Sequence, residues 1–191
     1  FIRGEASFSD QTNRKMQRSY CRDFYYHNED ALPIWVLLEI ISFGDLIKLY
    51  HVYFDLYHKR RTPPFDHRLL EHIRNIRNAA AHNNCLIAHI NRKVEENNRL
   101  SNILATYPQI TKSRRKKYLR KQFTQDFTAL ILAYEAFVKS RSMRRSARQA
   151  LDDLFLSRMC RHPEYFAKND ILTDAHRYCT EIVRCFLKNN D

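Results

Sequence analysis

The chain has 191 residues, of which 44% are hydrophobic, with only two glycines and five prolines. This composition excludes a long disordered protein and a β-turn-rich one. The length is sufficient for a hydrophobic core. The formal net charge of +12 at pH 7 indicates a polyanionic partner.

Helical patterns follow one another along the chain, so the sequence predicts an all-α protein. A first helix is expected near 12–27, followed by a polar turn at 28–30. A second helix is expected from Pro33 to about 59, because proline fits the first turn of a helix. We expect a bend at Ser42-Phe43-Gly44, and Thr62-Pro63-Pro64 ends this part of the chain.

The next helix is expected from about 67 to 88, with Asp66 as its N-terminal cap. Further helices are expected near 92–105, 116–139, 144–160 and 171–188. The second helix, the 67–88 helix and the strongly apolar 116–139 helix are the expected core bundle. We therefore predict a helical bundle over 1–140 and a helical extension of the same domain over 141–191.

The expected 67–88 helix contains the hexapeptide Arg77-Asn78-Ala79-Ala80-Ala81-His82. An imidazole can exchange protons near neutral pH, and a guanidinium stays charged and can bind phosphate oxygens. On a regular helix, Asn78 and His82 share one face, with Arg74 one turn earlier. The apolar stripe lies elsewhere, so His82 is expected to point away from the core and to be available for chemistry. A purely structural or surface role for His82 stays open.

Two stretches together carry a family resemblance. The residues from Arg77 to His82 resemble the signature of the HEPN superfamily of helical ribonucleases, and Pro33 to Gly44 resembles its AbiD/AbiF-type abortive-infection branch. The resemblance implies an HEPN-like helical bundle, a role in phage defence, and metal-independent RNA cleavage by residues that meet across a dimer interface. It makes Arg77, Asn78 and His82 the catalytic set. The chain begins at Phe1 and relatives carry further helices upstream, so the N-terminal part of the bundle is expected to be incomplete.

Glu39 is the one acidic residue in the apolar stretch from Ile34 to Ile41. A buried carboxylate needs a partner, and Arg74 or Arg77 on a neighbouring helix could supply it. Glu39 is then expected to orient an active-site arginine. A solvent-facing glutamate is equally consistent with the sequence.

Basic residues form several patches, and the densest precedes the long apolar helix. This run comprises Lys112, Arg114, Arg115, Lys116, Lys117, Arg120 and Lys121. Phosphate neutralisation by such residues releases counterions, so we expect salt-sensitive RNA binding with little dependence on sequence. The alternative is a solvated helix surface.

The cysteines and the hydropathy pattern bear on the compartment. Five cysteines occur, an odd number with no Cys-x2-Cys pair, which argues against a secreted disulfide framework and gives no zinc-ligand spacing. No uninterrupted apolar run of about 18 residues appears, and nothing resembles a signal peptide. The expected location is the cytoplasm, and no membrane association, metal or other cofactor is expected.

The leading hypothesis is a metal-independent endoribonuclease in which the 2′-hydroxyl of the RNA attacks the adjacent phosphate. The products would carry a 2′,3′-cyclic phosphate and a 5′-hydroxyl. Because one chain supplies one His of this motif, a homodimer is expected to provide both acid and base. One alternative is a non-catalytic RNA-binding module that holds a non-coding RNA as inhibitor or guide, and another is a protein-interaction subunit that meets an acidic antitoxin.

Overall fold

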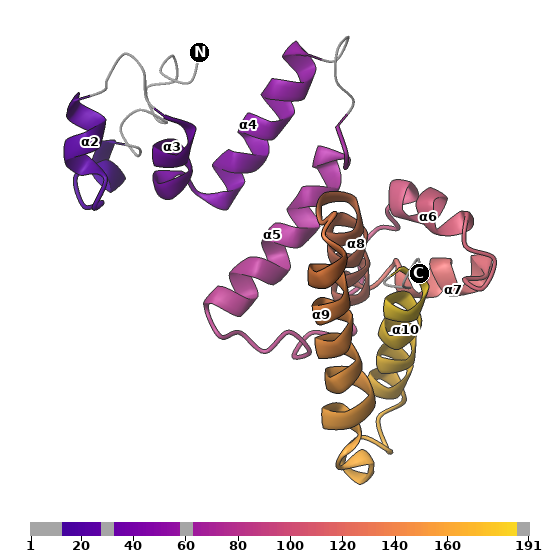
Figure 1. The fold of residues 1–191 in the computed structure, drawn as a ribbon. Helices are drawn as coiled ribbons and strands as arrows, with labels where there is room; N and C mark the ends of the chain where they lie inside the picture. Colours follow the sequence, from indigo (N-terminus) through magenta and orange to yellow (C-terminus); the bar gives the residue numbers. More distant parts are fainter. Residues whose placement is uncertain (1–12, 28–32, 58–62, 187–191) are drawn as a thin grey trace. The chain divides into compact units, whose positions relative to one another are not determined.

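The computed structural model describes residues 13–27, 33–57 and 63–186 (Figure 1). Within these ranges the regular structure is helical, apart from one isolated β-bridge, so the all-α prediction is confirmed. The chain divides into two compact units, Phe1–Arg61 and Thr62–Asp191. The boundary between the units therefore falls inside the predicted 1–140 bundle, and residues 141–191 share a unit with the hexapeptide.

The first unit contains the described helices α2 (Arg22–His27), α3 (Ile34–Ile40) and α4 (Phe43–Leu56). The expected continuous helix over 12–27 is wrong, because residues 13–16 are helical and turns separate them from α2. The Ser19 hydroxyl accepts a hydrogen bond from the Cys21 amide at 3.0 Å, and such a local bond competes with the helical pattern. The predicted polar turn at 28–30 lies outside the described residues.

The predicted second helix is broken into α3 and α4 where a bend was expected. Ser42 is the N-cap of α4, and its hydroxyl accepts a hydrogen bond from the Asp45 amide at 3.1 Å. A capping serine has extended backbone angles, so it starts a new helix and does not bend an existing one. Pro33 likewise lies just before α3, as its N-cap. Val36 and Ile40 of α3 pack with Met16 in a small buried cluster.

The second unit is built around α8 (Gln122–Phe137), in which nine of sixteen residues are buried. It packs against α5 (His67–Ala81) and α10 (Asp170–Phe186) (Figure 1). The remaining helices of this unit are α6 (Asn98–Ala105), α7 (Lys112–Tyr118) and α9 (Arg141–Asp152), the last followed by a π-helical turn at Asp153–Ser157. The helix that carries the hexapeptide is thus held by a helix about fifty residues further along the chain.

The predicted 116–139 helix is two helices, α7 and α8. Residues 119–121 separate them, and the buried Thr124 hydroxyl donates hydrogen bonds to the carbonyl oxygens of Tyr118 and Lys121 at 2.5 and 3.2 Å. The first of these bonds satisfies the Tyr118 carbonyl, which in an uninterrupted helix would accept from the Gln122 amide; that amide donates instead to the Arg92 carbonyl at 3.0 Å. The predicted 92–105 helix begins only at Asn98, because the Asn97 side chain caps it.

The helices of the expected core fall into both units. The structure assigns α3 and α4 to the first unit and α5 and α8 to the second, so a core bundle shared by all of them stays a prediction. The predicted extension also supplies core, because Tyr178, Ile182 and Val183 of α10 are at most 2% exposed. Burial of these three large side chains makes α10 an integral part of the second unit.

Candidate functional site at the end of helix α5

Helix α5 starts where the sequence predicted and ends seven residues early. Asp66 caps it, since its carboxylate accepts a hydrogen bond from the Arg68 amide at 3.0 Å. At the other end, Asn83 has a φ of 52°. The amides of Asn83 and Asn84 donate to the carbonyl oxygens of Ala80 and Ala79 at 3.2 and 2.8 Å. This pair of bonds is the Schellman motif, with asparagine in the left-handed position that usually takes glycine.

The early end of the helix places His82 at its C-cap. His82 is exposed, in agreement with its expected position away from the core. Its backbone amide donates to the carbonyl of Asn78 at 3.0 Å, which keeps the last turn closed. The imidazole is therefore presented to solvent at a fixed point of the backbone.

Arg77 and Asn78 are joined directly. An Nη1–H of Arg77 donates to Oδ1 of Asn78 at 3.0 Å, and the Arg77 side chain is exposed. The bond occupies the carbonyl oxygen of the Asn78 amide, so its N–H groups are the part left to meet an anion. A guanidinium, an amide donor and an imidazole thus lie within the last two turns of one helix. These are the groups that can bind a phosphodiester and exchange a proton with it.

Of the two alternatives for Glu39, the buried carboxylate is not observed. Glu39 is exposed on α3, so it has no desolvation penalty that an arginine must offset. Arg74 pairs instead with Glu71, one turn away on its own helix. This outcome matches the solvent-facing alternative, and an orienting role for Glu39 stays a prediction.

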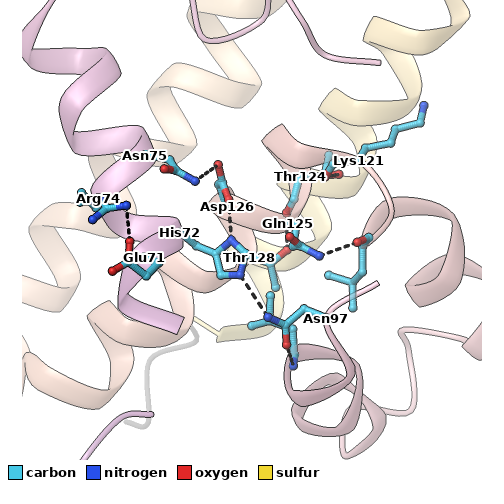
Figure 2. A network of polar contacts seen from close by, with 12 residues as sticks. Glu71, His72, Arg74, Asn75, Asn97, Lys121, Thr124, Gln125, Asp126 and Thr128 are labelled. Atoms are coloured by element: carbon cyan, nitrogen blue, oxygen red, sulfur yellow. Dashed lines mark hydrogen bonds and ion pairs between the residues drawn. The ribbon is translucent and has the colours of Figure 1, made fainter. Parts of the chain in front are cut away.

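A polar network that the sequence did not predict joins α5 to α8 (Figure 2). Asp126 of α8, with its side chain 5% exposed, accepts from Nδ1 of His72 at 2.6 Å. Its other oxygen accepts from the Asn75 amide at 3.3 Å. Because His72 and Asn75 lie on the turns just before Arg77, the network fixes the position of α5 on α8.

The network also determines which ring nitrogen of His72 carries a proton. The Asn97 side-chain oxygen caps α6 by accepting from the amides of Arg99 and Leu100, at 3.0 and 3.2 Å. Its Nδ2 group therefore faces Nε2 of His72, at 3.1 Å, and donates to it. Nε2 is an acceptor and Nδ1–H is the donor to Asp126. Both ring nitrogens of His72 are occupied, so His72 is a structural residue and does not supply a second catalytic imidazole.

The sequence contained a pattern that could have identified Asp126 as a buried carboxylate. It is an acidic residue within a long apolar helix, the same pattern that singled out Glu39. The residue with this pattern is buried at Asp126 and exposed at Glu39, because burial depends on which neighbours cover the helix, and α5, α6 and α10 all contact α8.

The predicted RNA-binding run is only partly available to a ligand. Four of its members have partners within the chain: Arg114 with Glu181, Arg115 with the Ile110 carbonyl, Lys117 with Asp174, and Arg120 with Glu96. Within the described part of the chain, Lys112, Lys116 and Lys121 form no ion pair. The run therefore serves partly to hold α7 against α10 and against the segment before α6.

An apolar cavity of about 1400 Å³ lies beside the end of α5, lined in part by Ile76, Leu86 and Ile87. The last two residues belong to the segment that was predicted to continue the helix. Leu156 and Phe166, from the segment between α9 and α10, also line it. Its predominantly apolar wall suits packing and offers little for the charge chemistry of the hexapeptide.

No disulfide joins the five cysteines, all of which lie in the described residues. Cys179 is buried, which raises the pKa of its thiol well above the usual range. Among the described residues, no group of three or more His, Cys, Asp and Glu side chains is placed to hold a metal ion. In the same residues, no helix is long and apolar enough to span a membrane.

The structure thus defines a helical protein with an Arg-Asn-x-x-x-His site at the end of α5, a helix that Asp126 of α8 holds through His72 and Asn75. Residues 3–88 match the family model for Abi-like proteins. The match includes both stretches that carried the resemblance, and it supports an abortive-infection family. No curated protein and no solved structure matches the chain.

Proposed function

We propose that this protein is a metal-independent endoribonuclease of the HEPN type, in its AbiD/AbiF-like branch, and that it acts in phage defence. The observation that supports this most is the placement of the exposed Arg77 and His82 and the half-buried Asn78 at the end of α5, within the part of the chain that matches Abi-like proteins. Exposure suits a polymeric substrate, because a folded RNA cannot enter a narrow closed pocket.

In the proposed reaction, the 2′-oxygen of a ribose attacks the neighbouring phosphorus while the bond from phosphorus to the 5′-oxygen breaks. A base removes the proton of the 2′-hydroxyl, and an acid delivers a proton to the leaving 5′-oxygen. His82 takes one of these two roles, which is commonly worth about 10² to 10⁴ in rate. Arg77 stabilises the charge on the non-bridging oxygens, and Asn78 positions the phosphate or the imidazole with its N–H donors.

The second proton-transfer group is proposed to come from another copy of the chain. His72 has both ring nitrogens occupied, by Asp126 and by Asn97, so it is a poor candidate for that group. A homodimer that brings two hexapeptides together would supply two copies of His82. The specific activity should then fall when the protein is diluted below the concentration at which it dimerises, and constant specific activity on dilution would contradict the dimer.

The proposal is tested with end-labelled RNA in EDTA, using the unmodified protein, His82→Ala and His89→Ala. His89 is the matched control because it is also exposed and lies in the segment after the hexapeptide. We expect cleavage by the unmodified protein and by His89→Ala, with cyclic-phosphate and 5′-hydroxyl ends, and a loss of about 100-fold or more for His82→Ala. Ends with a 3′-hydroxyl, or equal cleavage by His82→Ala, would overturn the mechanism.

The second candidate is a non-catalytic module that holds a non-coding RNA. The net charge of +12 and the basic run around α7 favour it as much as they favour a nuclease. If RNA affinity survives in His82→Ala and no preparation cleaves RNA, this candidate replaces the first. Absence of RNA affinity at low salt would instead favour an acidic protein partner, such as an antitoxin.

A further inference from the structure

Two lysines face each other across the isolated β-bridge of the second unit. Lys93 and Lys121 pair in antiparallel fashion, and the flanking hydrogen bonds run from Val94 N to Arg120 O at 2.9 Å and from Gln122 N to Arg92 O at 3.0 Å. The lysines are thus the non-hydrogen-bonded pair of the bridge, the kind whose side chains approach most closely. Like charges directly opposite each other are destabilising.

A buried neutral side chain holds the two segments of the bridge together. The Gln125 side chain, 4% exposed, donates to the carbonyl oxygens of Glu95 at 2.9 Å and Leu119 at 2.7 Å. It therefore ties together the two segments that carry the lysines. Figure 2 shows Gln125 close to Thr124 and Lys121. These bonds do not depend on the lysine charges, so the fold keeps the backbones of Lys93 and Lys121 opposite each other although both side chains carry a positive charge.

Both lysines line a cleft of about 800 Å³ between residues 91–96 and α7. Its lining includes five cationic side chains and two acidic ones. The cationic ones are Lys93, Lys116, Lys117, Arg120 and Lys121, and the acidic ones are Glu95 and Glu96. Lys117 is engaged by Asp174, and Arg120 is engaged by Glu96. Among the described residues, Lys93, Lys116 and Lys121 have no ion pair, which leaves three ammonium groups around one hollow.

We propose that this cleft is a phosphate-binding site, in which Lys93, Lys116 and Lys121 hold a phosphate group of an RNA backbone or of a free nucleotide. A phosphate carries several acceptor oxygens and can contact more than one ammonium group at once. Binding relieves the repulsion between Lys93 and Lys121, so the anion replaces a destabilising contact with two favourable ones. The site goes beyond the proposed nuclease activity, because it requires no cleavage and shares no residue with the hexapeptide.

The test uses full-length protein with His82→Ala as background, so that RNA stays intact. Lys93→Gln is compared with Lys139→Gln, which removes the same charge from another exposed lysine. Binding of a 12-nucleotide oligouridylate is measured over a range of salt concentrations. We expect Lys93→Gln to weaken binding at least about fivefold and to lower the slope of log affinity against log salt by about 1, with little effect from Lys139→Gln.

Thermal unfolding at low salt supplies an independent readout. Lys93→Gln should raise the melting temperature without phosphate by about 1 to 3 °C, because it removes the repulsion, and should lose the stabilisation that inorganic phosphate or uridine monophosphate gives the background protein. Lys116→Gln lies outside the bridge and should lose the same stabilisation without the initial gain. If Lys93→Gln fails to fold, Lys116→Gln alone still tests whether the cleft binds phosphate.

The two sources of phosphate are separated by the ligands themselves. Weakened binding of oligouridylate by Lys93→Gln and Lys116→Gln supports a nucleic-acid site. Stabilisation by uridine monophosphate, lost in both variants, with oligouridylate binding unchanged, supports a free-nucleotide site. Equal responses of Lys93→Gln, Lys116→Gln and Lys139→Gln to every ligand would overturn the proposal. None of these outcomes depends on whether the protein cleaves RNA.

Discussion

Asn83 determines where the helix of the hexapeptide ends. Its φ of 52° is the only positive value among the described residues. Asparagine tolerates the left-handed region better than other residues with a Cβ, and its place directly after His82 makes that histidine the C-cap. Without this turn the helix would continue past His82, and His82 would lie inside the helix and not at its end.

Substitution of Asn83 tests this role. Asn83→Ala should lower the free energy of unfolding by about 1 kcal/mol, because alanine pays the full penalty of the left-handed conformation, whereas Asn83→Gly should be neutral or slightly stabilising. Asn84→Ala is the control, since its backbone amide and not its exposed side chain makes the bond to Ala79. Urea unfolding measures all three, and an equal effect of alanine and glycine at position 83 would contradict the account.

At the scale of elements, α8 positions the candidate site although it contributes no catalytic group. Its buried Asp126 holds both His72 and Asn75 of α5. A second contact joins α7 to α10, where Lys117 Nζ lies 2.5 Å from a carboxylate oxygen of Asp174. The first contact is buried and the second is largely exposed, so their contributions to stability should differ.

Removal of the Asp126 carboxylate should be strongly destabilising. Asp126→Ala leaves the Nδ1–H of His72 and the Asn75 amide without their acceptor, which should lower the free energy of unfolding by about 2 kcal/mol or more. Asp126→Asn keeps one acceptor and should cost less. Glu164→Ala is the control, because Glu164 and its partner His162 are both 61% exposed. Equal free energies of unfolding for Asp126→Ala and Glu164→Ala would show that the Asp126 network does not stabilise the fold.

The Lys117 to Asp174 contact predicts a dependence on pH. The hydrogen bond from Lys117 lowers the pKa of Asp174, and the same bond raises the pKa of Lys117. A lowered carboxyl pKa stabilises the fold above its unfolded value of about 3.9, and this stabilisation is lost as the pH falls through the lower folded-state value. The raised lysine pKa gives stabilisation below about pH 10.4 that is lost as the pH rises through the higher folded-state value.

Asp174→Asn should therefore be less stable than the unmodified protein at pH 7, by no more than about 1 kcal/mol because the pair is screened by solvent. The difference should shrink as the pH is lowered below about 4. Urea unfolding from pH 3 to 7 measures it, with Asp170→Asn as the control on the same helix. A difference that stays constant over this range would contradict the assignment.

At the scale of the whole molecule, the family match and the compact units divide the chain differently. The match covers residues 3–88, so it crosses the boundary after Arg61 and stops before α8 and α10. The helix of the hexapeptide lies in the match, but the helices that hold it lie outside. Stability of the site therefore depends on a part of the chain that the family model does not describe.

A fragment that spans residues 62–191 should fold without the first unit. It contains α5, α8 and α10 with the buried side chains between them, which is enough for a core. We expect a helical circular dichroism spectrum and one cooperative thermal transition. A spectrum of unfolded chain, or a gradual loss of signal on heating, would contradict an independent second unit.

Local patterns predicted the parts of this protein that depend on neighbours in sequence. The Asp66 cap, the helical setting of the hexapeptide and the exposure of His82 follow from side-chain chemistry and from a period of 3.6 residues. Helix ends were predicted less well, because Asn83 and Ser42 act through backbone geometry that a periodic pattern does not contain.

Tertiary structure decided the pairings between distant residues. Asp126 meets His72 across 54 positions, and Lys121 meets Lys93 across an isolated bridge. Neither pair has a characteristic spacing, because the distance along the chain between two contacting helices is set by the connections between them. The sequence alone thus determined an all-α protein with an exposed Arg-Asn-x-x-x-His helix. Only the packing of α5, α6 and α8 decided which buried carboxylate holds that helix, and only the bridge between residues 92–94 and 120–122 brought Lys93 opposite Lys121.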